Sequence, residues 1–186
     1  MNRLRNLGLM LVAALIVNTT FAQERTVTVG GAPMYPSKNI IENAVNSKDH
    51  TTLVAAVKAA DLVQTLQSTG PFTVFAPTNE AFNMLPGGTV DMLLKPENKA
   101  TLTGILTYHV VTGRLGSKEL AELIKAGNGT AELTTVEGGK LWVMMKGKHI
   151  VLKDEKGGMA MVTIKDVHQS NGVIHVIDHV VMPNKL

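Results

Sequence analysis

The segment Asn171–Pro183, NGVIHVIDHVVMP, constrains the fold of this 186-residue chain more than any other segment. It opens with an Asn-Gly pair, continues as a run of mainly β-branched residues, and closes at a proline. A run of this kind, bounded by turn residues, predicts a strand. The fold must therefore contain a sheet near the carboxyl end of the chain.

A second segment, Phe72–Phe82, reads FTVFAPTNEAF. It combines a short apolar strand, a proline that stops it, and the start of a helix. Thr78 stands at the N-cap position, where its hydroxyl can accept from a free backbone N–H. Glu80 places negative charge at the positive end of the helix. This segment therefore predicts a strand that turns directly into a capped helix.

Tyr108-His109 lies between these two segments, in LTGILTYHVV. The three elements, in this order, resemble the fasciclin domain family. The resemblance extends from about Lys38 to Pro183 and implies a wedge-like β-sandwich of about seven strands with several helices packed along one side. It also implies a set of structural motif residues, namely Phe75, Thr78, Asn79, Asn171, His175 and Asp178.

The amino terminus has the features of a secretory signal. Arg3 and Arg5 precede the apolar run Leu7–Val17, and small residues lead up to Ala22. We expect residues 1–22 to be a signal peptide cut after Ala22, because the run is shorter than the roughly 20 residues that span a bilayer. Residues 23–38, rich in glycine and proline, are expected to form a flexible leader. Residues 39–184 are expected to form a single fasciclin domain.

Periodicity separates the chain into two regions. Apolar residues with helical spacing dominate up to about Gly127, whereas an alternation of period two dominates after Gly129. Expected strands cover Ala131–Val136, Lys140–Lys146, His149–Lys153, Met159–Ile164 and Val173–Met182. Helices followed by a meander of strands indicate an α+β fold, since an α/β fold would alternate its elements throughout.

Charge and cysteine content exclude several classes. Removal of the signal takes away Arg3 and Arg5, so the formal net charge falls from +3 to +1. Charges are interspersed and aromatic residues are few, which argues against a nucleic-acid surface. The chain has no cysteine, so an exported protein of this sequence relies on burial and backbone pairing for its stability.

Catalytic residues are not evident in the sequence. No nucleophile elbow, zinc-protease motif or phosphate-binding glycine loop is present. His175 and His179 lie on one face of a strand but about 13 Å apart, too far to share a metal ion. We expect His175 to be packed and hydrogen-bonded, as the resemblance implies. Asp178 is expected to accept from backbone N–H groups of a nearby loop, because an unpaired buried carboxylate would be costly. No cofactor is expected.

Methionine is the remaining candidate for chemistry. Met159 and Met161 share a strand face, and His149 and His168 are not far away in sequence. Thioether and imidazole ligands suit Cu(I) in an exported protein. The alternative is that these methionines fill gaps in the core. A periplasmic carrier of a small ligand or of copper therefore stays open as a second hypothesis, and a hydrolase as a weaker third.

The resemblance implies a binding role for two short segments, Tyr108-His109 and Asp166-Val167. On this first hypothesis the chain is a secreted or periplasmic, non-enzymatic protein that mediates adhesion to a cell-surface or extracellular-matrix protein or polysaccharide. Asp166→Ala would then lower attachment and leave the fold intact. Both rings of Tyr108-His109 could equally pack inward, and Asp166 could be only a turn residue.

Overall fold

A computed structural model describes residues 25–185 of the chain. The predicted signal peptide, residues 1–22, lies outside this range. Seven strands form one mixed sheet in the order β4-β3-β9-β8-β7-β6-β5. Its strands are β3 (Phe72–Pro77), β4 (Val110–Thr112), β5 (Thr130–Thr134), β6 (Lys140–Lys146), β7 (His149–Lys153), β8 (Met159–Gln169) and β9 (Gly172–Ile177).

The sheet curls until its two edges nearly meet. Val111 in β4 forms an antiparallel bridge with Thr135, just beyond the end of β5. The backbone N–H of Val136 also donates to the carbonyl of Val110 at 2.7 Å. The chain therefore folds as a nearly closed wedge, and the expectation of an α+β fold with about seven strands is confirmed.

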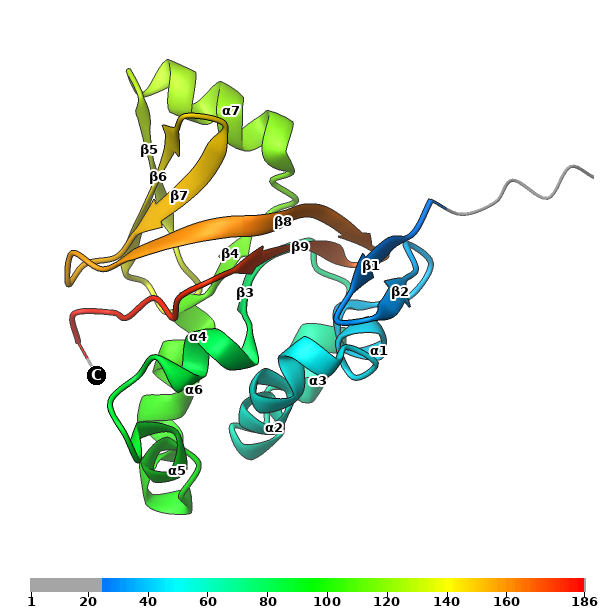
Figure 1. Cartoon of the computed structure of the whole chain (residues 1–186), viewed down its shortest axis with the longest axis vertical. Helices are drawn as coiled ribbons and strands as arrows, with labels where there is room; N and C mark the ends of the chain where they lie inside the picture. The colour runs from blue at the N-terminus through cyan, green and yellow to red at the C-terminus, as the bar shows by residue number, and fades with distance from the viewer. Residues whose placement is uncertain (1–24, 186) are drawn as a thin grey trace, which may run out of the picture.

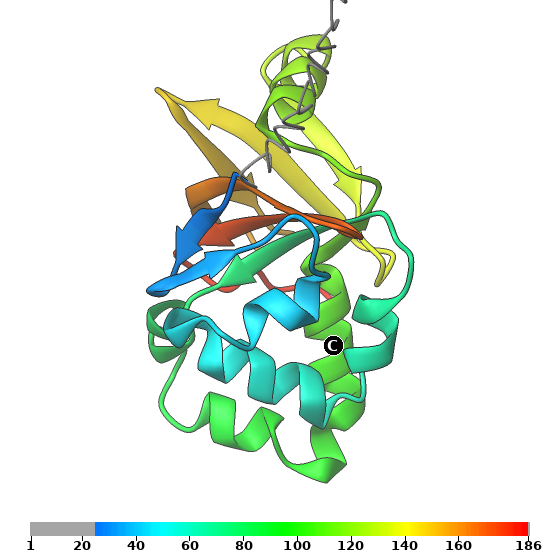
Figure 2. The same cartoon turned by 90° about the vertical axis from the view of Figure 1, so that its right-hand side faces the viewer.

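Most helices cover one side of this wedge, as Figures 1 and 2 show. They are α1 (Ile40–Ala44), the 3-10 turn η1 (Lys48–His50), α2 (Thr51–Ala59), α3 (Val63–Gln67), α4 (Asn79–Asn83), α5 (Thr89–Leu93), the 3-10 turn η2 (Pro96–Asn98) and α6 (Lys99–Tyr108). Helix α7 (Ser117–Ala126) departs from the predicted one-sided arrangement and packs against β5 and β6 at the other end. No helix among residues 25–185 is long and apolar enough to cross a membrane.

Strands β3 and β9 form the centre of the molecule. They pair in parallel, with Phe75 opposite His175 and Ala76 opposite Val176. Successive side chains point to opposite faces, so Phe75 joins the apolar cluster under α7, whereas Ala76 and Val176 join the cluster under α1–α6. All six residues of β9 are buried. A strand covered on both faces explains why its sequence reads as a continuous apolar run.

Residues 27–34 are ordered as two strands, although the sequence predicted a flexible leader over residues 23–38. These residues form a two-stranded antiparallel hairpin of β1 (Val27–Val29) and β2 (Ala32–Met34). Its turn is made by Gly30 and Gly31, both at positive φ. Val29 and Met34 are each 3 % exposed and belong to the helix-side cluster. The glycines that suggested a loose segment thus serve a tight turn, and the apolar residues flanking them are buried.

The turn between β8 and β9 connects the sheet to the helices through Asn171. The Oδ1 atom of Asn171 accepts from the N–H of Ile40 at 3.0 Å, and its Nδ2 donates to the carbonyls of Leu66 and Ser68, each at 2.8 Å. Gly172 follows because a Cβ there would lie 2.3 Å from the carbonyl oxygen of Phe72. The Asn-Gly pair found in the sequence therefore fastens α1 and α3 to the central strands.

Tyr108 is the last residue of α6, and the N-caps of α5 and α7 are Gly88 and Gly116. One strand extends beyond its expected end. Strand β8 runs on to Gln169 because a register shift between Ile164 and Val167 bends it without ending its pairing.

Candidate functional site

Tyr108 is fully buried at the end of α6. Its hydroxyl donates to the carbonyl of Lys140 at 2.5 Å and accepts from the N–H of Glu155 at 3.2 Å. Burial, together with the nearby carboxylates, raises the pKa of Tyr108 to about 12. The tyrosine therefore joins α6 to the start of β6 and the end of β7, and its ring is not available to an external partner.

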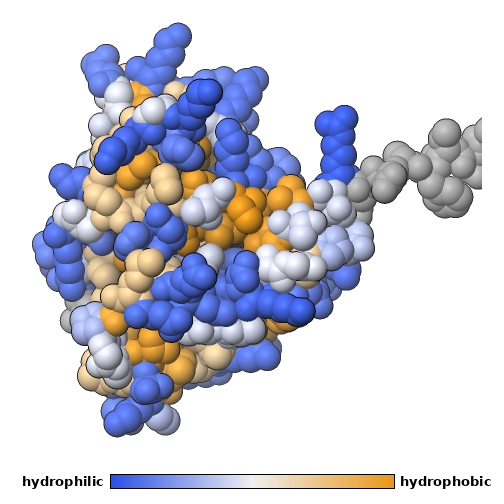
Figure 3. Space-filling model, viewed as in Figure 1, coloured by the Kyte–Doolittle hydropathy of each residue, from blue (hydrophilic) through white to orange (hydrophobic). Residues whose placement is uncertain are grey.

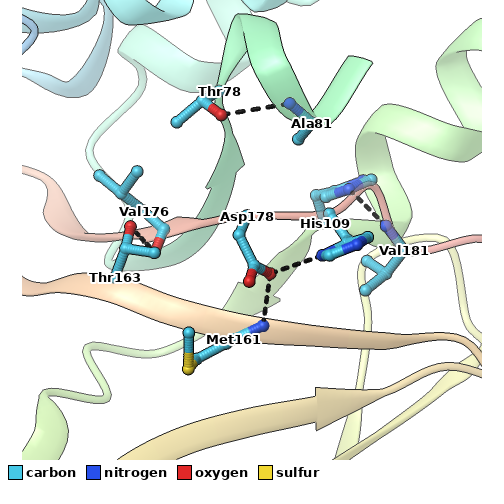
Figure 4. Close-up of polar contacts among 9 residues, drawn as sticks. Thr78, Ala81, His109, Met161, Thr163, Val176, Asp178 and Val181 are labelled. Atoms are coloured by element: carbon cyan, nitrogen blue, oxygen red, sulfur yellow. Dashed lines mark hydrogen bonds and ion pairs between the residues drawn. The ribbon is translucent and has the colours of Figure 1, made fainter. Parts of the chain in front are cut away.

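His109, the next residue after Tyr108, is also buried, with 2 % of its surface exposed. One ring nitrogen, Nδ1, lies 2.8 Å from the carbonyl of Ile105, and the other, Nε2, accepts from the N–H of Val181 at 3.2 Å (Figure 4). A carbonyl needs a donor and an N–H needs an acceptor, so the ring is neutral with its proton on Nδ1. Burial lowers the pKa of His109 to about 4. It holds the segment after β9 against α6.

The Asp166-Val167 segment lies in the irregular part of β8. Val167 is 1 % exposed and belongs to the helix-side cluster, whereas Tyr108 belongs to the cluster under α7. The structure therefore does not bring the two predicted binding segments together on one exposed surface. Asp166 is half-buried and adopts a positive φ of 60°.

Asp166 stabilises the start of α7. Its Oδ1 accepts from the N–H of Ser117 at 2.6 Å, and its Oδ2 accepts from the Ser117 hydroxyl. Burial alone would raise the pKa of Asp166, but the hydrogen bonds from Ser117 outweigh it and lower the pKa. The N-cap residue Gly116 has no side chain, so this carboxylate supplies the capping group from a distant strand.

Asp166→Ala is expected to lower the free energy of unfolding by about 1–2 kcal/mol, because it removes the cap and leaves alanine at positive φ. Asp166→Asn is the matched variant, since asparagine tolerates this conformation and keeps one acceptor oxygen. We expect urea denaturation to show a smaller loss for Asp166→Asn. Equal stability of Asp166→Ala and the unmodified protein would contradict the capping role. A loss of attachment by Asp166→Ala thus reports on the fold as well as on a contact.

The structural motif residues predicted from the resemblance hold neighbouring elements together. Thr78 caps α4 by accepting from the N–H of Ala81 (Figure 4). Asn79 accepts from the N–H of Thr52 at 3.0 Å and donates to the carbonyl of Lys48 at 2.8 Å, which links α4 to η1 and α2.

Phe75 and His175 stack across the central strand pair, with ring centroids 5.7 Å apart. His175 is fully buried; its Nδ1 accepts from the N–H of Asp166 at 3.3 Å, and its Nε2 lies 2.8 Å from the carbonyl of Leu115. Burial lowers the pKa of His175. Both ring nitrogens are thus used inside the fold.

Asp178 accepts from a strand and not from a loop. Its Oδ1 accepts from the backbone N–H of Met161 at 2.7 Å (Figure 4). The same oxygen lies 2.8 Å from Nδ1 of the exposed His179. Among residues 25–185, no group of three or more histidine, cysteine or acidic side chains is arranged to hold a metal ion. His109, His175 and Asp178 have internal partners, whereas the Nε2 atom of the buried His50 has none.

An exposed apolar surface lies on the outer face of β6, β7 and β8. The register places Met144, Val151 and Met161 in one row across these strands, and Trp142, Lys153 and Met159 in the next. Met159 and Met161 are 43 % and 36 % exposed, Trp142 and Met144 are partly exposed, and Val151 between the methionines is 5 % exposed. Figure 3 shows apolar surface between charged side chains on this side of the molecule. We call these residues, Trp142, Met144, Val151, Met159 and Met161, the methionine face.

The inner face of the same strands is covered. Leu141 and Val143 alternate with the members of the methionine face along β6 and are fully buried, together with Leu120 and Ile124 of α7. The sequence indicated that Met159 and Met161 share a face, but it did not reveal Met144 and Trp142 beside them. Strand register brings these residues together, and it is set by the turns that join β6 to β7 and β7 to β8 and not by the alternation along one strand.

The fold and the buried motif residues define a class of protein. The family model of the Fasciclin domain matches residues 48–183, and the chain belongs to the fasciclin domain family. It is 44 % identical over 177 residues to Protein sll1483 of Synechocystis, a match that covers 95 % of this chain and 89 % of that protein. It is 38 % identical to Immunogenic protein MPB70 of Mycobacterium bovis, covering 75 % of this chain and 66 % of that one.

Longer relatives and a solved structure have the same domain. Human periostin is 32 % identical over 145 residues, which are 77 % of this chain and 16 % of periostin. A FAS1 domain pair from the insect cell adhesion molecule Fasciclin I superposes with a TM-score of 0.71 at 17 % identity, covering 88 % of this chain and 60 % of that one. At that identity the likeness establishes the fold alone.

Proposed function

We propose that this chain is an exported, non-enzymatic binding protein that attaches to a protein of the cell surface or extracellular matrix through the methionine face. Family membership supports extracellular binding in general. The methionine face, with Met159 and Met161 exposed beside the partly exposed Trp142 and Met144, is the single observation that points to this particular surface. Apolar side chains gathered at the surface commonly mark an interaction site. The proposal includes export by residues 1–22, with cleavage after Ala22.

The composition of the face favours a protein partner. Methionine and tryptophan are enriched at the centres of protein interfaces, where charged residues are depleted, and the rim is polar. Here the Lys140–Glu132 ion pair, with its atoms 3.0 Å apart, borders the apolar rows beside Trp142, and Lys153 lies between Trp142 and Met159 within the second row. Flexible thioether side chains adapt to varied apolar partners. A polysaccharide would instead require more exposed hydrogen-bonding groups than these rows offer.

The double variant Met159→Lys/Met161→Lys is expected to reduce capture of the partner at least tenfold, because it places two strongly hydrated charges in the apolar rows. The measurement is capture by the immobilised mature protein of components from the envelope fraction of its own organism. The matched control is Met84→Lys/Met92→Lys, which adds the same charge at the end of α4 and in α5, at positions that are 60 % and 51 % exposed.

Two results would overturn the proposal. Equal capture by the two double variants would exclude the methionine face. Capture that survives protease treatment of the envelope fraction would show that the partner is not a protein. Unchanged thermal unfolding of both variants is expected, since all four positions lie at the surface.

A further inference from the structure

The segment after β9 runs from the centre of the sheet to the end of β7, where the chain turns toward β8 (Figure 1). Val181 is 1 % exposed and belongs to the cluster under α7, whereas Val180 and Met182 pack against the helix-side cluster. The segment therefore contacts both clusters, although the last strand, β9, already ends at Ile177. We call residues 180–184 the strap.

Three backbone N–H groups fasten the strap, and each donates to a titratable side chain. They are the N–H of Val181, which donates to Nε2 of His109 at 3.2 Å, that of Met182, which donates to Oδ2 of Asp154 at 2.9 Å, and that of Asn184, which donates to Oε2 of Glu155 at 2.8 Å. The residue between the last two, Pro183, has no N–H. Strands pair instead through backbone carbonyls, which do not titrate. The strap is therefore held by the kind of acceptor that a change of pH can remove.

His109 supplies the acceptor that is most sensitive to a proton. Its Nδ1 lies against the carbonyl of Ile105, so Nε2 is the acceptor nitrogen of the neutral ring. A protonated imidazole has two donors and no acceptor, so its bond to the N–H of Val181 would be lost. Under the strap, burial lowers the pKa of His109 to about 4, against the opposing effects of the Ile105 carbonyl and of the charge on Asp154. Without the strap the ring would meet water, and its pKa would return toward about 6.5.

Other charged or titratable groups surround the strap. They are Asp154 and Glu155 just after β7, Tyr108 on α6, Glu137 and Lys140 at the turn into β6, Lys185 after the strap, and Asp178 and His179 before it. The hydrogen bonds that Glu155 accepts from the backbone of Lys140 and Asn184 lower its pKa, and burial raises the pKa of Tyr108 to about 12. Both groups therefore keep their charge between pH 7.5 and 5.0. The exposed His179 pairs with Asp178 and not with the strap.

We propose that acid releases the strap: a proton on Nε2 of His109 displaces the N–H of Val181, and residues 180–184 leave the sheet while the rest of the domain stays folded. Asp178 forms the boundary of the movement, because its N–H donates to the carbonyl of Met161 at 3.2 Å and its Oδ1 accepts from the N–H of the same residue. Release would uncover the apolar side chains that Val181 covers in the cluster under α7. The proposal does not depend on the partner proposed for the methionine face.

The test measures hydrogen exchange of the backbone amides by NMR, as protection factors corrected for the intrinsic effect of pH on exchange. With a pKa of about 4 under the strap and about 6.5 in water, the amides of Val181 and Met182 are expected to lose about 25-fold of their protection between pH 7.5 and 5.0. Opening of the strap alone exposes little surface. About 1 M urea should therefore change the protection of these two amides by less than about twofold, and that of the β9 amides by at least about fivefold.

A pair of variants assigns the effect to His109. Glutamine keeps one donor and one acceptor but does not titrate, so His109→Gln should leave the protection of Val181 nearly constant between pH 7.5 and 5.0. The matched control is His179→Gln, which removes an exposed histidine beside the strap and should keep the loss seen in the unmodified protein. The urea dependence of the unmodified protein tests local opening independently of both variants.

Any of three results would overturn this proposal. The first is a protection of Val181 and Met182 that stays constant from pH 7.5 to 5.0 in the unmodified protein. The second is the same urea dependence at these amides and at those of β9, because the strap would then open only when the whole domain unfolds. The third is an equal loss of protection with acid in His109→Gln and His179→Gln.

Discussion

Asn171→Ala is expected to lower the free energy of unfolding by about 3–5 kcal/mol. The asparagine side chain is buried and makes three hydrogen bonds to backbone groups of three residues, Ile40, Leu66 and Ser68. Alanine would leave an N–H and two carbonyls without this partner, and the groups of Ile40 and Leu66 lie in buried hydrogen bonds. Each buried group that loses its partner costs about 1–3 kcal/mol.

Urea denaturation at pH 7.5 measures this loss. Asn83→Ala is the matched control, because Asn83 is exposed at the end of α4 and the same substitution there should change stability by less than about 0.5 kcal/mol. Asn171→Asp tests the chemistry further. The aspartate carboxylate can still accept from the N–H of Ile40 but cannot donate to the carbonyls of Leu66 and Ser68. Asn171→Asp should therefore lose nearly as much free energy of unfolding as Asn171→Ala. Asn171→Ala with a stability close to that of Asn83→Ala would refute the assigned role.

Lowering the pH from 7.5 to 5.0 is expected to remove about 2 kcal/mol of stability through His109 alone. In the folded protein the pKa of His109 is about 4, compared with 6.5 for an ordinary histidine. The unfolded chain therefore takes up the proton first as the pH falls. Stability from this residue is complete above pH 6.5 and is lost progressively toward pH 4.

Burial lowers the pKa values of His50 and His175 as well, so they should steepen the same transition. The lowered pKa of Asp166 affects stability only at more acidic pH, where that carboxylate takes up its proton. The window between pH 6.5 and 5 therefore reports on the buried histidines.

His109→Gln separates this effect from other sources of acid sensitivity. Glutamine offers one donor and one acceptor, as the neutral ring does, but it does not titrate. The variant is expected to be less stable at pH 7.5 and to lose about 2 kcal/mol less than the unmodified protein between pH 7.5 and 5.0. His149→Gln, at an exposed position of β7, is the control and should keep the original pH dependence. If His109→Gln left the pH dependence of the free energy of unfolding unchanged, a neutral His109 in the folded state would be contradicted.

The central strand, the capped helix α4 and the α+β class could be predicted from sequence because each depends on neighbouring residues. The apolar run of β9 and the Thr78 cap are local patterns. The parallel pairing of β9 with β3 was not predicted, since about 100 residues of chain separate the partners. The hairpin of residues 27–34 was missed because burial of Val29 and Met34 depends on helices formed later in the chain.

The candidate site was harder to predict than the fold. Tyr108-His109 reads in sequence as a pair of polar rings beside apolar residues, which fits either an exposed contact or a buried bridge. Its burial follows from the position of the carboxyl end of α6 between β6 and the segment after β9, and no local pattern indicates that position. Likewise, the sequence does not show that His50 is buried with its Nε2 atom unpartnered, because that depends on the helices and strands packed around it.

The paired strands β3 and β9 stand between the two apolar clusters and contribute side chains to both. Because these strands separate the two clusters, substitutions in one cluster should have little effect on packing in the other. Relatives can therefore differ in the helix-side cluster and keep the outer sheet surface, or the reverse. Proteins of this family would then share a fold without sharing a function.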